Sequence, residues 1–150
     1  MVSSRKNFIE SLPIELVILI VERVVFYSLQ DLVSVKLCSR FLNEVANKRS
    51  LYQKVTLASF PPETSWTMNQ HAISFMKICI ASENLEVLYK KGVFDFFNRN
   101  DPAALGMVKK AVEGGHRGAE YVLFISSIFE GGISMREGLM CIANMKKTCQ

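Results

Sequence analysis

A chain of 150 residues and 17.0 kDa can form one globular domain or two small ones. Apolar side chains make up 49% of it and the mean hydropathy is +0.18, which excludes disorder over the whole chain and leaves apolar surface for a partner. The net charge of +4 comes from isolated basic pairs spread along the chain, so no basic tract points to nucleic acid.

The four cysteines have no C-x-x-C spacing, and only two histidines are present to help them bind a metal. We interpret them as reduced and mostly buried, and we expect neither a metal site nor a cofactor. A Cys/His hydrolase built from one of the first three thiols stays open as an alternative, because such sites assemble in space, although no motif activates a thiol here. The thiols are Cys38, Cys79, Cys141 and Cys149, and the histidines are His71 and His116.

The apolar stretch over residues 12–27 is interrupted by Glu15, Glu22 and Arg23 and has no small-residue cleavage site. It is therefore neither a secretion signal nor a bilayer span. We expect an intracellular protein, in the nucleus and/or the cytoplasm, that binds no membrane.

Helix breakers divide the chain into three parts. Residues 8–55 hold one proline and no glycine, residues 56–69 are rich in Pro, Ser and Thr, and residues 70–150 contain all eight glycines. We therefore predict two helical units, 8–55 and 70–150, joined by a linker over 56–69. Trp66 in this linker is expected to fold back onto a helix and anchor the loop.

The first unit is predicted to open with a helix that Ser11 caps and that runs to about Phe26. Pro13 and Glu15 fall in its first turn, where both residue types are favoured. Apolar residues cover nearly the whole circumference of this helix, which a surface helix with a single buried stripe would not show.

Two shorter helices are predicted to follow and to complete a trihelical cluster. Ser28 and Asp31 have the spacing of a capping box at the start of the second helix. Ser39 can cap the third helix, before the chain reaches Leu51 and Tyr52.

The second unit is predicted to consist of helices over residues 72–81, 84–97, 102–111, 119–130 and 134–147. Asp101 can cap the helix that Pro102 opens. Two Gly-Gly pairs, at 114–115 and 131–132, end helices and lie seventeen residues apart, which is the half-repeat spacing of a helix-turn-helix array. The first pair lacks the strand and the Lys-Ser/Thr of a phosphate loop, so His116 beside it is interpreted as a turn residue. An aromatic cluster is expected in the core: Phe94, Phe96 and Phe97.

Residues 8–55 carry an ordered set of short motifs: Leu12-Pro13-Ile14-Glu15-Leu16, Asp31-Leu32, Cys38-Ser39-Arg40-Phe41 and Leu51-Tyr52. This set resembles the F-box, the module by which substrate adaptors of Skp-cullin-F-box ubiquitin ligases dock on the Skp linker. Phe41 stands where the family usually has Trp.

The F-box resemblance implies that the Leu-Pro end and one side of the helices bind a Skp-family protein, and through it a cullin. Apolar anchors of this kind dominate interfaces, each costing about 2 kcal/mol or more when truncated. The residues implied as contacts are Leu12, Pro13, Leu16, Ile20, Leu32, Val35 and Cys38.

Residues 85–147 resemble the Sel-type, tetratricopeptide-like repeats that are attached to a group of plant F-box proteins. The resemblance is carried by residues 88–93, 110–116 and 119–123 and by the second Gly-Gly pair. The sequence departs from the repeat by having Phe124 where Gly is preferred, Ser127 where Tyr is preferred and Gly138 where Ala is preferred.

We therefore predict an all-α protein, a trihelical F-box followed by a short region of helical hairpins, that has no catalytic residues. Its expected function is to dock on the Skp linker and to present an unknown protein substrate for ubiquitin transfer. A helical-repeat scaffold without a ligase role is the first alternative. The second is a small helix-turn-helix nucleic-acid binder that would use Lys36, Arg40, Lys48 and Arg49.

Overall fold

The described residues of the computed structural model are 8–27, 29–57 and 70–147, and all their regular structure is helical, which confirms the all-α prediction. The chain divides into two units, residues 1–84 and 85–150, each described by itself. Trp66 and Ser28, for which an anchor and a cap were predicted, lie outside the described residues, as does most of the expected linker.

Unit 1 begins with a 3-10 turn, η1 (Phe8–Ser11), followed by α1 (Ile14–Tyr27). The prediction that Ser11 caps α1 is wrong, because its hydroxyl donates to the Phe8 carbonyl at 2.6 Å. The first helical amides, those of Leu16 and Val17, donate instead to the carbonyl of Pro13.

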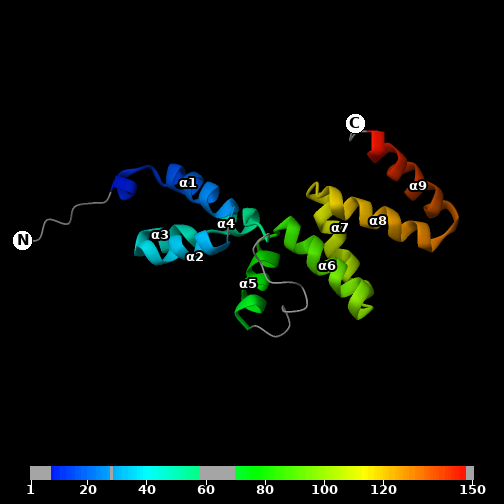
Figure 1. The fold of residues 1–150 in the computed structure, drawn as a ribbon, viewed down its shortest axis with the longest axis horizontal. Helices are drawn as coiled ribbons and strands as arrows, with labels where there is room; N and C mark the ends of the chain where they lie inside the picture. Colours follow the sequence, from blue (N-terminus) through cyan, green and yellow to red (C-terminus); the bar gives the residue numbers. More distant parts are fainter. Residues whose placement is uncertain (1–7, 28, 58–69, 148–150) are drawn as a thin grey trace, which may run out of the picture. The chain divides into compact units, whose positions relative to one another are not determined.

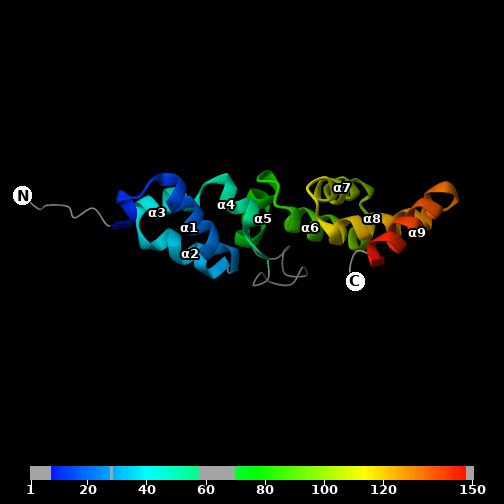
Figure 2. The ribbon, with the colours of Figure 1, turned by 90° about the horizontal axis from the view of Figure 1, so that it is seen from above.

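Three further helices pack around α1, and the next two helices of the chain lie side by side (Figures 1 and 2). They are α2 (Leu29–Cys38), α3 (Arg40–Ala46) and α4 (Arg49–Lys54). Ser39 caps α3 as predicted, accepting from the Leu42 amide at 3.1 Å. The trihelical prediction missed α4, whose single buried pair, Leu51 and Tyr52, is too short to show a helical period.

The helix α5 (Gln70–Ala81) clusters with unit 1, whereas the sequence analysis began the second unit at residue 70. The reason is a buried junction just after α5. The Asn84 side-chain amide donates to the carbonyls of Tyr52 at 2.7 Å and Val55 at 2.9 Å. These two bonds tie the end of α5 to the end of α4.

Unit 2 is a series of helices in which each packs on the next. The elements are α6 (Leu85–Arg99), η3 (Pro102–Ala104), α7 (Leu105–Glu113), α8 (Arg117–Glu130) and α9 (Gly132–Lys147). Since α6 and α8 begin 32 residues apart, the unit holds two successive helical hairpins, and Figure 1 shows α8 and α9 as the second of them.

The predicted punctuation of unit 2 is confirmed. Asp101 accepts from the Ala103 amide and caps η3, with Pro102 in the first turn. Gly115 and Gly131 have φ of 90° and 77°, which glycine adopts without strain. His116 is more than a turn residue, because its Nδ1 accepts from the Ala119 amide and caps α8, which starts two residues earlier than predicted.

Candidate functional site

The outer face of α1 is the largest apolar feature of unit 1. Val17, Val21 and Val25 recur every four residues and are buried against the neighbouring helices. The rows beside them point outward and remain exposed. We define the α1 outer face by these exposed apolar residues: Leu16, Leu19, Ile20 and Val24.

The contacts implied by the F-box resemblance divide between surface and core. On α1, Leu16 is 47% exposed and Ile20 is 49% exposed, and both belong to the outer face. Pro13 and Cys38 are also exposed, and Leu12 and Val35 are half-buried. Leu32 was expected at the surface as well, but it is only 2% exposed, because α2 turns this side chain into the core.

The sequence analysis missed exposed apolar residues that the structure adds to this surface. Leu19 and Val24 lie on the α1 outer face, and Val33 and Leu37 are exposed on α2, which packs against α1. The apolar circumference of α1 was the available signal. It could not assign individual residues, because nothing in the sequence says which side the neighbouring helices cover.

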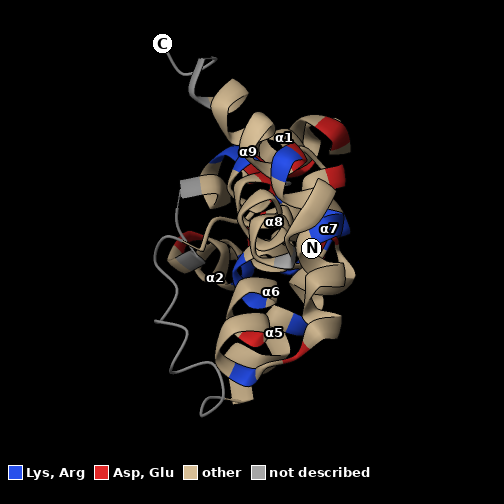
Figure 3. Ribbon diagram, turned by 90° about the vertical axis from the view of Figure 1, so that its right-hand side faces the viewer, with Lys and Arg blue, Asp and Glu red and all other residues tan. Residues whose placement is uncertain are grey.

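The basic residues of the nucleic-acid alternative are partly occupied within unit 1. The Lys36 ammonium donates to Asn47 Oδ1 at 2.7 Å and to the Tyr52 hydroxyl at 2.6 Å. Arg49 forms an ion pair with Glu83 at 2.6 Å. Figure 3 shows acidic and basic residues interspersed along the helices, which is not the one-sided basic surface that phosphate binding requires.

The thiols and histidines do not form the hydrolase site that was left open. Burial raises the pKa of the Cys79 thiol to about 12, so it stays protonated and is a poor nucleophile. Cys38 is exposed, so the expectation of mostly buried thiols fails there, and His116 Nδ1 is engaged in capping α8. Within the described ranges, no group of three or more His, Cys, Asp or Glu could hold a metal ion.

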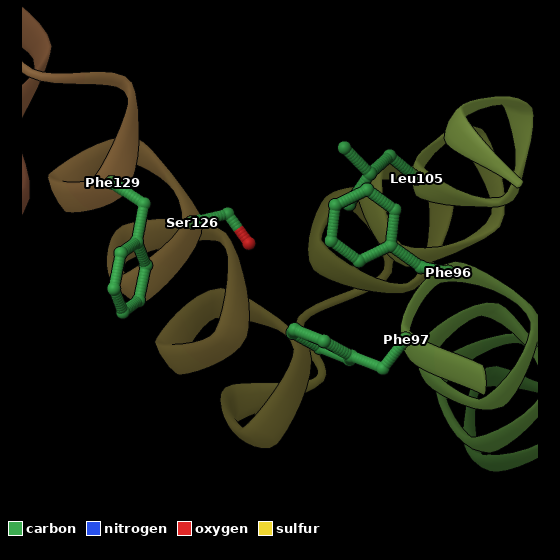
Figure 4. Close-up of a pocket in the computed structure, with 5 residues that line it drawn as sticks. All are labelled: Phe96, Phe97, Leu105, Ser126 and Phe129. Atoms are coloured by element: carbon green, nitrogen blue, oxygen red, sulfur yellow. The ribbon is translucent and has the colours of Figure 1, made fainter. Parts of the chain in front are cut away.

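A cavity of about 300 Å³ opens in unit 2 between the end of α6, the start of α7 and the end of α8 (Figure 4). The rings of Phe96 and Phe97 meet edge to face there, with centroids 4.9 Å apart. The prediction that the Phe94, Phe96 and Phe97 cluster lies in the core is wrong for Phe97, which is 55% exposed because the helix end leaves it uncovered. The cavity is lined by Phe96, Phe97, Leu105, Ser126 and Phe129.

Paired helices repeating every 32 residues define unit 2 as a helical-repeat structure. A family model described as plant tetratricopeptide repeats matches residues 58–150, more than half of the chain. The chain therefore belongs to the plant tetratricopeptide repeat family. Neither the curated proteins nor the solved structures contain a match to it.

Family membership sets the coarse function. Repeats of the tetratricopeptide type are typically non-catalytic and present surfaces for protein interaction. In the part of the chain that the structure describes, no helix is long and apolar enough to cross a bilayer.

Proposed function

We propose that this chain is a non-catalytic substrate adaptor of a Skp-cullin-F-box ubiquitin ligase. In this proposal, unit 1 docks on a Skp-family linker, and through it on a cullin, while the helical repeat presents a protein target. The proposal places the chain in the nucleus and/or the cytoplasm. The α1 outer face is the observation that carries it.

The α1 outer face favours a protein partner over a purely structural role. Unit 1 already buries the row Val17, Val21 and Val25, so its own core does not use Leu16 and Ile20. A contiguous apolar surface of this kind on one helix is typical of an interaction site. The Leu12-Pro13 motif directly precedes this helix, where the F-box resemblance expects the Skp contact.

An adaptor of this kind acts by proximity. Holding a target beside the ubiquitin-transfer subunits raises its effective concentration at the site of transfer. The adaptor must therefore supply geometry, while the reactive groups belong to other subunits. This agrees with the typically non-catalytic character of the repeat family.

The test is copurification of the full chain with a Skp-family protein, followed by measurement of the dissociation constant. The double variant Leu16→Ala, Ile20→Ala should weaken binding by at least about tenfold, since apolar anchors cost about 2 kcal/mol each when truncated. Circular dichroism checks that the variant keeps its helices.

The matched control removes two exposed apolar side chains from unit 2, in the variant Ile133→Ala, Met140→Ala. This control should bind the Skp protein as the wild type does. Absence of binding by the wild type, or equal binding by the α1 variant, would contradict Skp docking. The chain would then be a repeat scaffold without a ligase role.

A further inference from the structure

The cavity in unit 2 has an apolar lining that contains a single polar side chain. Three phenylalanines and Leu105 form its walls, and Ser126 supplies one hydroxyl. Figure 4 shows the Ser126 oxygen pointing from α8 into the space in front of the rings of Phe96 and Phe97. An apolar pocket with one well-placed polar group is the usual composition of a selective binding site.

The hydroxyls of Ser126 and its neighbour Ser127 differ in their partners. Ser127 Oγ donates to the Phe124 carbonyl at 2.8 Å, so its hydrogen bond is made within α8. Ser126 Oγ is buried and has no hydrogen-bond partner. A buried hydroxyl without a partner is unfavourable, and a ligand that supplies one gains affinity and selectivity.

The size and the walls of the cavity restrict what fits. A dry cavity of about 150 Å³ is enough to hold benzene, so about 300 Å³ accommodates an aromatic ring with a polar substituent. Phe97 is 55% exposed and Phe129 is 85% exposed, so the cavity is open to solvent along these rings. An occupant can therefore insert a ring while the rest of its chain stays outside.

We propose that this pocket binds a tyrosine side chain on an extended segment of a partner protein, with the phenol hydroxyl hydrogen-bonded to Ser126 Oγ. The phenylalanine rings contact the phenol ring, and the hydroxyl pairing selects tyrosine over phenylalanine. The assignment to a protein segment rests on the proposed presentation of a protein target by the repeat. It does not depend on Skp docking by unit 1.

The test is an NMR titration of the full-length, ¹⁵N-labelled chain with capped tripeptides Gly-X-Gly, where X is Tyr, Phe, Trp or Leu. The Tyr peptide should produce saturable shifts of the Phe97, Ser126 and Phe129 amides. The Phe peptide should bind about threefold to tenfold more weakly, the ratio expected for one neutral hydrogen bond. The Leu peptide should produce no saturable shift.

Two adjacent serines provide matched variants. Ser126→Ala should erase the preference for Tyr over Phe, while Ser127→Ala should keep it, because the Ser127 hydroxyl already has a partner. An unchanged preference in Ser126→Ala would overturn the proposal. Tighter binding of the Trp or Leu peptide than of the Tyr peptide, or no saturable shift at the cavity, would also overturn it.

A second variant keeps the test decisive if Ser126→Ala unfolds. Leu105→Phe adds volume at the cavity wall and should weaken the Tyr peptide at least about fivefold, as overfilling a packed site does. Unchanged affinity in this variant would overturn the proposal. Copurification with the Skp protein, measured on Ser126→Ala, should be unaffected, so failure of this site and failure of ligase docking give different results.

Discussion

Gly138 sets how closely α9 can approach α8. A Cβ atom at this position would lie 2.7 Å from the Phe124 carbonyl oxygen and 2.5 Å from Ser127 Oγ. The three departures from the repeat pattern, Phe124, Ser127 and Gly138, therefore meet at one contact. In the preceding hairpin the close approach is made by Gly92 on α6, which faces Ala104 and Val108.

Gly138→Ala should lower the free energy of unfolding of the chain by about 1 kcal/mol. The clash with a backbone oxygen, typically costing 1–3 kcal/mol, outweighs the gain of about 1 kcal/mol in helix propensity. Urea unfolding followed by circular dichroism measures the change. The control is Gly106→Ala, 32 residues earlier, where a Cβ would meet nothing within 4 Å and a small gain is expected. Equal stabilisation by both substitutions would contradict the close contact at Gly138.

His116 joins two residue-level contacts at the start of α8. Its Nδ1 accepts from the Ala119 amide at 3.0 Å, and its ring stacks on Tyr89 with centroids 4.5 Å apart. His116→Ala should lower the free energy of unfolding by about 2 kcal/mol, since a helix cap and an aromatic contact each contribute about 1 kcal/mol. His116→Asn keeps a capping oxygen and should lose about half as much. Thermal unfolding compares the variants, and equal losses would mean that the cap contributes nothing.

At the scale of elements, α1 combines two apolar sides with different tasks. Its buried row is fixed to α2, α3 and α4, and the buried Glu22 carboxylate pairs with Lys54 of α4 at 2.5 Å. This ion pair and the valine row orient the helix, so that the α1 outer face is presented at a defined angle. A partner helix or groove could then bind without reorganising unit 1.

The connection between α4 and α5 depends on Asn84. Its amide is buried and satisfies the carbonyls of Tyr52 and Val55. Asn84→Ala should lower the free energy of unfolding by about 2–4 kcal/mol, because it leaves two carbonyls unpaired. The midpoint of thermal unfolding measures this. The control Asn43→Ala, at an exposed position of α3, should cost less than about 0.5 kcal/mol. A loss at Asn84 as small as that of the control would contradict the junction.

At the scale of the whole molecule, the surplus of apolar residues is divided between two units. In unit 1 it is concentrated on the α1 outer face, and in unit 2 it lines the cavity and remains exposed on Phe129, Ile133 and Met140. Each unit therefore carries its own candidate surface. An adaptor needs two such surfaces, one for the scaffold and one for the target.

The sequence by itself determined where most helices begin and end. Asp101, Ser39 and the two Gly-Gly pairs act on backbone groups within a few residues, so their effect can be read locally. The same local glycine spacing predicted the hairpin period of unit 2. The cap at Ser11 failed because a local competitor, the Phe8 carbonyl, takes its hydroxyl.

Only the tertiary structure decided which side chains face outward. The sequence shows α1 as apolar all round, and packing against α2, α3 and α4 selects the valine row for burial and leaves Leu16 and Ile20 exposed. Packing likewise turns Leu32 into the core and leaves Phe97 at an open cavity. Burial depends on neighbours that are distant in sequence, and a local pattern carries no information about them.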